Sequence, residues 1–455
     1  AERPHAWPSL RRRAGGGGVA RSAGRHMMTS DRTYGYNSKA DGYAEQYAYK
    51  PVSADPASGE TGAAPMDGHD RPVAVQEQSG CARDCRGLAT VLCQPLNILI
   101  VFVPAGIASG IMEWGCAPTF ACNFIAIVPL AGILGASTEA LAVHTGQMIG
   151  GLLNATFGNA VEMIVTVNAI KAGLVTVVQG SLLGSILSNL LLVLGMAFFA
   201  AGLWIKESHF SSMGASANMT CLALGSIALA LPTIYSSLPD ASLEDMLMIS
   251  RISAVLLAVV YALFLVFQLL THADMFTGEG EDEDEQALMS APTSIVVLVS
   301  ATCCVAVCSE YLVDSIEGVS EQYGLPKAFI GVILLPIVGN AAEHATAVTV
   351  AAKGKMDLAL GVAIGSSTQI ALLVVPFSVF VGWYYDVPMS LDFRSFDACV
   401  LILAVFLASG VLHDGSSNWL EGAMLVATYI LIAIICWFIP EPEELPSNGS
   451  GSREL

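Results

Sequence analysis

The sequence predicts an all-α polytopic membrane protein of about 11 transmembrane helices, in which one N-terminal helix precedes two inverted five-helix repeats. The 455 residues are 54% hydrophobic and only 13% charged, whereas soluble domains carry about 25% charged residues. Apolar runs of about 20 residues, long enough to cross a bilayer as helices, recur from Leu88 to Ile439. One motif also occurs twice, as GNAVE at 158–162 and as GNAAE at 339–343.

The first 86 residues are predicted to form a disordered tail, because they are rich in Gly, Ser, Ala and charge and poor in branched apolar residues. Residues 1–26 are Arg-rich and acid-poor. This pattern is typical of a transit segment, but it also fits sequence upstream of a start at Met27 or Met28, which we favour.

Eleven apolar segments are predicted to span the membrane, separated by turn and charge signals. These spans are 88–110, 120–136, 142–170, 175–203, 214–234, 249–271, 292–313, 326–351, 357–383, 396–412 and 417–439. The third, fourth, eighth and ninth are the longest and most polar, as helices that are tilted or broken around a site often are. The predicted divisions are a tail (1–86), a first helix (87–110), a first repeat (120–271), an acidic linker (272–291), a second repeat (292–439) and a C-terminal tail (440–455).

The linker between the sixth and seventh spans contains the run EGEDEDE at 279–285. It lacks the ligand spacing of an EF-hand, so we interpret it as a solvated acidic linker. A weaker role, in which its field gathers cations near the pore, stays open. The net charge of −19 argues against a nucleic-acid partner, which would need a basic patch. Most of the eleven cysteines lie in predicted spans, where free Cys behaves as a small hydrophobe.

The two motif windows align without gaps over 32 residues, 158–189 with 339–370. The matched positions are mostly Gly, Asn, Glu and Ser, which carry geometry and polarity rather than generic hydrophobicity. The first motif lies on the third span and the second on the eighth, and five crossings reverse the chain direction. This arrangement predicts an inverted repeat of the kind found in secondary transporters, with a site near the midplane.

Each repeat has a second element, Gly180-x3-Gly184-Ser185 in the first and Gly361-x3-Gly365-Ser366 in the second. Small residues four apart let helix backbones approach closely, so packing explains the glycines. The hydroxyl groups of Ser185 and Ser366, together with the Gln369 amide, fit packing and cation ligation about equally well.

The motif spacing predicts a site for a hard cation. Asn159 and Glu162 lie three apart on one helix face, as do Asn340 and Glu343. Calcium takes 6–8 oxygen ligands, often including carboxylates, and two carboxylates match the charge of one divalent ion. A buried Glu without such a function would be structural glue.

The same carboxylates predict proton coupling. When the cation leaves, desolvation and like-charge repulsion favour protonation of the pair. Cation and protons therefore compete for the same oxygens, as in an exchanger, and no Walker A sequence or enzymatic motif is present. His344 points about 100° away from Glu343 on a helix, which fits a hydrogen-bonding or proton-relay role or simple packing.

At these residues, over 150–195 and 324–383, the chain resembles the cation/proton exchanger family, the vacuolar calcium/proton antiporters of the calcium/cation antiporter superfamily. The resemblance extends over about 88–440, whereas sodium/calcium exchangers carry a different, Pro-Glu type of motif. It implies that the following residues bind the cation and protons: Glu162, Glu343, Asn159, Asn340, Ser185, Ser366 and Gln369, next to the motif glycines Gly158 and Gly339. It also implies that Glu139 and Glu321 line the access routes, although ordinary interfacial charge explains them equally well.

The resemblance implies a transporter of calcium, sometimes manganese, which exchanges the cation for protons at the membrane of a vacuole or other acidic organelle. No cofactor is expected; the partners are Ca2+, H+ and the lipid bilayer. Basic loop residues divide almost evenly between the two sides, with a slight preference for a cytosolic N-terminus. Two alternatives stay open: an exchanger coupled to sodium or potassium, and a cation channel with acidic rings.

Overall fold

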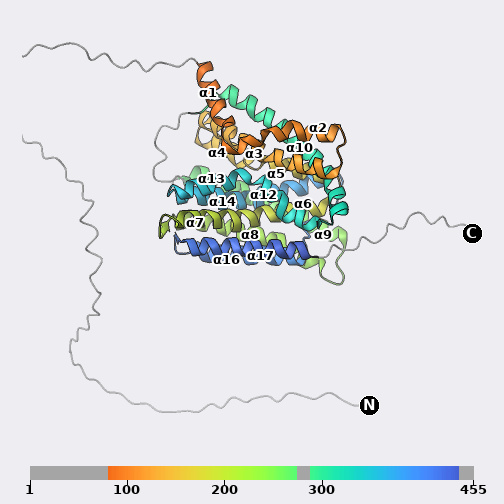
Figure 1. Ribbon diagram of the computed structural model, residues 1–455. Coiled ribbons are helices and arrows are strands. Elements are labelled where there is room, and N and C mark those ends of the chain that lie inside the picture. Colours follow the sequence, from red (N-terminus) through yellow and green to blue (C-terminus); the bar gives the residue numbers. More distant parts are fainter. Residues whose placement is uncertain (1–79, 274–286, 440–455) are drawn as a thin grey trace, which may run out of the picture. The chain divides into compact units, whose positions relative to one another are not determined.

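A computed structural model describes residues 80–273 and 287–439. These residues are mostly helical (Figure 1). The elements are α1 Gly80–Leu92, η1 Pro95–Val101, α2 Phe102–Ile111, α3 Cys116–Thr145, α4 Gln147–Phe157, α5 Ala160–Lys171, α6 Val175–Leu187, η2 Ser188–Val193, α7 Leu194–Gly202, β1 Ser208–His209, α8 Ser212–Ser236, α9 Leu243–Val266, η3 Phe267–Thr271, α10 Ala291–Tyr323, α11 Lys327–Phe329, η5 Ile330–Leu334, α12 Leu335–Gly339, α13 Ala341–Ala352, α14 Met356–Gln369, η6 Ile370–Val374, α15 Val375–Tyr384, α16 Ser395–Val411, β2 Ser416–Ser417 and α17 Trp419–Phe438. The predicted tails and acidic linker lie largely outside the described residues.

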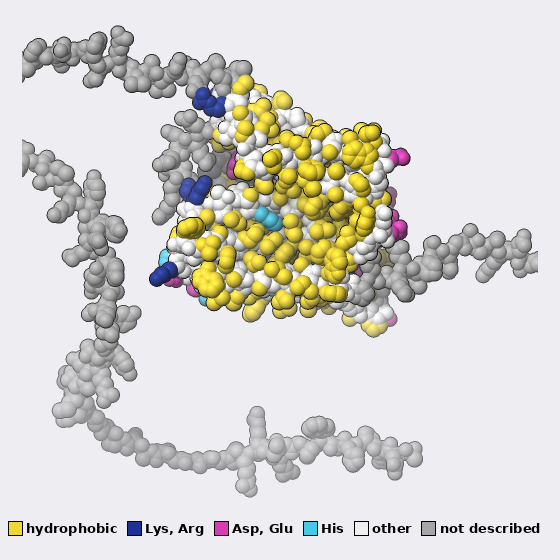
Figure 2. Space-filling view, in the orientation of Figure 1, with side chains coloured by type: hydrophobic (Ala, Val, Ile, Leu, Met, Phe, Trp, Pro, Cys, Tyr) yellow, Lys and Arg dark blue, Asp and Glu magenta, His cyan; other side chains and the backbone are white. Residues whose placement is uncertain are grey.

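The helices have the length and surface of an integral membrane protein. Within the described ranges, seven continuous helices are long and apolar enough to cross a bilayer, and three bent pairs also pass if each is one span. The 17-residue α16 is shorter than these helices. Figure 2 shows hydrophobic side chains over most of the visible face, with the charged side chains near its edges. Such a surface suits contact with lipid, because the hydrocarbon core of a bilayer contains no water and apolar side chains are stable in it.

Two of the bent pairs break at the repeated motif. The first bends by 41° between Phe157 and Ala160, and the second by 56° between Gly339 and Ala341. At each break the motif asparagine leaves the helical conformation, with φ −103° and ψ 19° at Asn159 and φ −90° and ψ 11° at Asn340. The prediction that the third and eighth spans are broken helices is confirmed.

The fourth and ninth predicted spans are interrupted by π-helical turns at related places. The segment η2 at 188–193 separates α6 from α7, and η6 at 370–374 separates α14 from α15. Each π-turn follows the Gly-x3-Gly-Ser element within about one turn. π-turns insert one extra residue and are frequent at functional sites.

The predicted division between the second and third spans, at 136 and 142, was wrong. The second span does not end at 136, because α3 continues to Thr145. The hydroxyls of Ser137 and Thr138 donate to the carbonyls of Ile133 and Leu134, so these polar residues are accommodated within the helix. The break comes instead at Gly146, whose φ of 80° suits glycine.

The other two corrections concern the first and seventh spans. The first is not one straight helix, because α1 and the helix that starts at Pro95 meet at 84°; proline cannot continue a preceding helix at its own nitrogen. The seventh span, α10, continues to Tyr323, ten residues beyond the predicted end at 313. Its acidic residues lie on the exposed face of the helix and therefore do not end it.

Helix α6 packs closely along the broken helix of the second half. A Cβ on Gly184 would collide with the carbonyl oxygen of Val332 and lie 2.6 Å from Pro336 Cγ. A Cβ on Gly180 would lie 3.4 Å from the backbone of Gly331. Because the residue numbers rise together along the contact, α6 and residues 327–344 run in the same direction.

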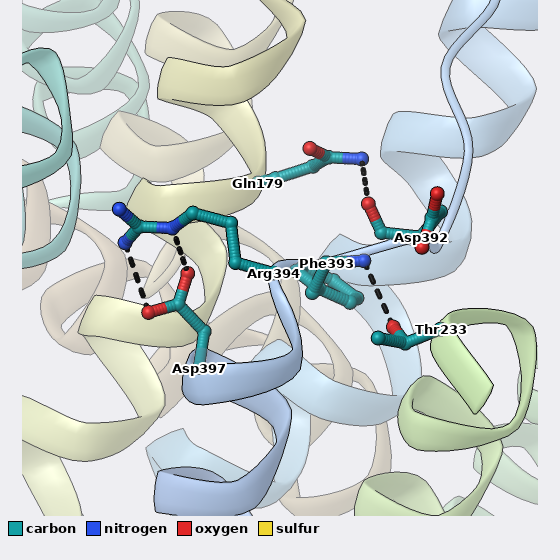
Figure 3. Close-up of polar contacts among 6 residues, drawn as sticks. All are labelled: Gln179, Thr233, Asp392, Phe393, Arg394 and Asp397. Atoms are coloured by element: carbon teal, nitrogen blue, oxygen red, sulfur yellow. Dashed lines mark hydrogen bonds and ion pairs between the residues drawn. The ribbon is translucent and has the colours of Figure 1, made fainter. Parts of the chain in front are cut away.

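The connection between α15 and α16, residues 385–394, is fixed to helices of the first half (Figure 3). Gln179 Nε2 on α6 donates to the carbonyl of Asp392 at 3.0 Å, and the Phe393 N–H donates to Thr233 Oγ1 on α8 at 2.9 Å. Arg394 forms a bidentate pair with the buried Asp397 at the start of α16. Side-chain bonds therefore hold one end of the two halves together.

The glycine contacts predict different outcomes for two matched substitutions. Gly184→Ala should destabilise the protein by about 1–3 kcal/mol, because its Cβ has no space against α12. Gly365→Ala, at the corresponding position of the second half, meets nothing within 4 Å and should stay within about 0.5 kcal/mol of the parent. Thermal unfolding of the detergent-solubilised protein, followed by size-exclusion chromatography, measures both, and equal losses would contradict the packing described.

Candidate cation site

The glutamate of the first motif lies against the backbone of the second motif. Glu162 is in the first turn of α5, and its side chain is only 8% exposed. A Cβ added to Gly339 would lie 2.8 Å from Glu162 Oε1, so the glycine leaves room for the carboxylate in this position. The two motifs therefore meet, and the positive end of the α5 dipole favours a carboxylate in its first turn.

The glutamate of the second motif is held at both carboxylate oxygens. Ser366 Oγ donates to Glu343 Oε1 at 2.8 Å, and Asn189 Nδ2 donates to Oε2 at 2.9 Å. Asn189 Nδ2 also lies 2.9 Å from Ser366 Oγ, which closes a triangle of polar groups. Hydrogen bonds to an ionised group contribute about 1.5–3 kcal/mol each, so Glu343 is fixed in one orientation.

The motif asparagines each bond to the crossing helix of the other half. Asn159 Nδ2 donates to Gln369 Oε1 at 2.8 Å. Asn340 Nδ2 donates to the backbone carbonyl of Ser185 at 3.4 Å. With Ser366 on Glu343 and Gly339 beside Glu162, the structure thus brings the predicted ligands from both halves together.

Four oxygen atoms of this cluster are buried without a hydrogen-bond donor. They are Asn159 Oδ1, Glu162 Oε2, Asn189 Oδ1 and Asn340 Oδ1. The amide nitrogens of all three asparagines are engaged, so the unpaired atoms are acceptors only. A buried unpaired polar atom costs about 1–3 kcal/mol, and hard cations are the partners that take carboxylate and amide oxygens.

The composition of the cluster also limits the metal. Among the residues that the structure describes, no three or more His, Cys, Asp and Glu side chains are grouped so that they could hold a metal ion. Two carboxylates with amide, hydroxyl and main-chain oxygens suit calcium or manganese rather than zinc, which prefers nitrogen and sulfur.

The half-buried imidazole of His344 lies beside this cluster. Its Nε2 is 3.1 Å from Ser188 Oγ on η2. This contact fits the hydrogen-bonding role that the sequence left open. The corresponding residue of the first half is Met163, so the imidazole is present on one side only.

The two acidic residues assigned to access routes are not among the buried residues of the site. Glu139 is exposed near the end of α3, and Glu321 is exposed two residues before the end of α10. Their positions near helix ends fit both an access role and ordinary interfacial charge.

Sequence reasoning missed Asn189 as a functional residue, although the side chain holds Glu343. Asn189 follows Ser185 by four residues, a spacing that places both on one helix face. Asn189 is not a matched position of the two halves, because its counterpart in the second half is Ile370, which cannot donate.

Comparison with known proteins decides the family. Residues 117–270 and 293–438 match the profile described as sodium/calcium exchanger protein. The chain belongs to this family. The match leaves out the tails and the acidic linker and includes every residue of the candidate site.

Relatives within the family agree with the resemblance to calcium/proton antiporters. The vacuolar calcium ion transporter of Schizosaccharomyces pombe is 44% identical over 350 residues, which are 76% of this chain and 85% of that protein. The Ca2+/H+ antiporter of Aphanothece halophytica is 42% identical over 362 residues, 76% of this chain and 97% of that protein. The solved structure of native YfkE is 37% identical in sequence and has a TM-score of 0.67. The alignment covers 76% of this chain and 100% of the YfkE chain.

The hydrogen bonds of Asn189 predict a loss of cation affinity in Asn189→Leu. Removing the amide leaves Glu343 Oε2 and Ser366 without their shared donor, so calcium affinity should fall about 10-fold or more, since each 1.4 kcal/mol is tenfold. Equilibrium binding of radioactive calcium to the purified protein measures the loss.

A matched control is Asn123→Leu. Asn123 is equally buried, and its amide donates to Gly106 of α2 rather than to a motif residue. If both variants lose affinity equally, or if Asn189→Leu loses none, Asn189 does not hold the site.

Proposed function

We propose that the protein is a calcium/proton antiporter that uses a proton gradient to move cytosolic calcium into a vacuole or another acidic organelle. The observation that carries this function is that the buried Glu162 and the half-buried Glu343 meet among a set of unpaired oxygens. The names of the relatives support the same exchange, since they are a vacuolar calcium ion transporter and a Ca2+/H+ antiporter. YfkE is also described as a Ca2+/H+ antiporter.

Calcium would bind between the two motifs. Ser366 and Asn189 hold the Glu343 carboxylate in one orientation, so calcium binding would not require its oxygens to be ordered first. Glu162 supplies the second negative charge from the other half. The unpaired Oδ1 atoms of Asn159 and Asn340 complete the ligand set from the helix breaks. Manganese, also a hard divalent ion, fits the same oxygens.

Protons would leave when calcium binds and return when it dissociates. Two carboxylates without a cation repel each other in a poorly hydrated site, and protonation removes both charges. A neutral site can change its exposure without carrying buried charge through the bundle. The exchange therefore needs a proton gradient and no ATP.

The change of exposure would use the two halves as inverted five-helix repeats in an eleven-helix plan. Helix breaks at Asn159 and Asn340 and the π-turns after Ser185 and Ser366 support this division. Contacts that cross between the halves, such as Asn159 with Gln369, would part and reform as one half rocks against the other.

Further residues have proposed roles around this cycle. The Ser188–His344 contact offers a relay for protons beside Glu343. Glu139 and Glu321 would attract cations at the two ends of the access route, because exposed carboxylates raise the local concentration of cations. The N-terminus would face the cytosol.

Reconstituted vesicles test the function. Calcium uptake should require an imposed pH gradient and collapse when a protonophore is added. Uptake that ignores the pH gradient and follows a sodium or potassium gradient would replace the proton with that ion. Flux far faster than the turnover of a carrier would indicate a channel.

The site predicts loss of exchange in Glu162→Gln and Glu343→Gln. Each amide keeps the shape of the side chain and removes one of two negative charges, so uptake should fall to background while the protein remains inserted and folded. Glu244→Gln, at an exposed position in the first turn of α9, is the control and should transport normally. Normal uptake by either motif variant would remove the proposed site.

A further inference from the structure

A small cavity lies beside Glu162 and is absent from the sequence-based account. Its volume is about 10 Å³, roughly that swept by one water-sized sphere. Its polar groups are Glu162, Ser181 and Ser185, and Gly339 of the second motif forms part of the wall. Ile127 of α3 and Leu312 of α10 close it with apolar surface.

The cavity has a polar group that lacks a partner. Glu162 Oε2 is buried without a hydrogen-bond donor. Glu343, in contrast, has donors at both carboxylate oxygens. An apolar cavity of this size would stay dry, but a cavity with a free carboxylate oxygen has a strong attraction for a cation.

Ser181 is the residue that distinguishes this cavity from the main site. It precedes Ser185 by four residues, so the two side chains lie on one face of α6 about 6 Å apart along the axis. Ser181 therefore lies between Ser185 and the N-terminal end of α6 at Val175. Gln179 holds the α15–α16 connection at this same end of α6.

The second half has no equivalent polar group. The counterpart of Ser181 is Val362, and the counterpart of Ser185 is Ser366, which is already engaged by Glu343. The additional hydroxyl group therefore lies beside Glu162 and has no counterpart beside Glu343, so the two halves of the site are not symmetric.

We propose that this cavity is a transit subsite, in which the divalent cation contacts Ser181 and Glu162 Oε2 between the main site and the α6 end of the bundle. The inference rests on the proposed transport function and adds a residue to it. A cation that only passes Ser181 makes this side chain important for the rate of transport, whereas equilibrium affinity is set by the motif residues.

Substitutions at Ser181 test the subsite, with calcium as the probe. Ser181→Val adds methyl groups to a space of about 10 Å³ and removes the hydroxyl. Maximal proton-driven uptake should fall about 10-fold, while equilibrium calcium binding in detergent stays within about twofold, since a tenfold rate change is 1.36 kcal/mol in the barrier. Ser181→Ala, which keeps the space, should lose less, and Ser181→Thr, which keeps the hydroxyl, should lie between the parent and Ser181→Val.

The matched control is Val362→Ile, which adds bulk at the counterpart position and should leave uptake within about twofold of the parent. Unchanged uptake in Ser181→Val, or an equal loss in Val362→Ile, would overturn the subsite. Loss of equilibrium binding in parallel with uptake would place Ser181 in the main site and also overturn a transit role. Absence of proton-driven uptake in the parent protein would instead refute the proposed function.

Discussion

Two carboxylates, the buried Glu162 and the half-buried Glu343, lie inside a bundle with an apolar outer surface and constrain the groups around them. Each of their oxygens needs a donor, a proton or a cation, because an unpaired buried charge is costly. The structure meets this need unequally. Glu343 receives donors from Ser366 and Asn189, whereas Glu162 keeps one oxygen unpaired beside a small cavity. The breaks at Asn159 and Asn340 place both carboxylates in the first turns of helices, where the helix dipole favours them.

The two halves are alike in sequence and different in contacts. Gly184 is packed against α12, whereas Gly365 has open space around its α-carbon. Asn189 and His344 have no polar counterparts, since Ile370 and Met163 occupy those positions. Approximate symmetry would suffice for the alternating access proposed above, because each half would need only to pack in two arrangements. The differences leave the two glutamates in unequal environments.

The sequence predicted the features that depend on local chemistry. Its apolar runs identified the membrane helices, and the repeated Gly-Asn-x-x-Glu motif identified most residues of the cluster. The predicted end of the second span was wrong because Ser137 and Thr138 donate their hydroxyls to carbonyls within α3. These polar residues therefore do not interrupt the helix.

Other features depend on tertiary packing and left no matched pattern in the sequence. The hydrogen bonds of Asn189 to Glu343 and Ser366 require helices from both halves. The cavity beside Ser181 exists because α3, α6 and α10 meet around Glu162 without filling the space. Neither feature could be predicted from the linear sequence, because each depends on which helices become neighbours.

The central claim is that calcium and protons compete for the two motif glutamates, and proton release on calcium binding tests it most directly. Calorimetric titration of the purified protein with calcium, repeated in buffers of different ionisation enthalpy, gives the number of protons released per calcium bound. We expect a net release of protons from the parent protein, and we expect both this release and calcium binding to disappear when both glutamates are replaced by glutamine. Calcium binding at these residues without any release of protons would contradict it.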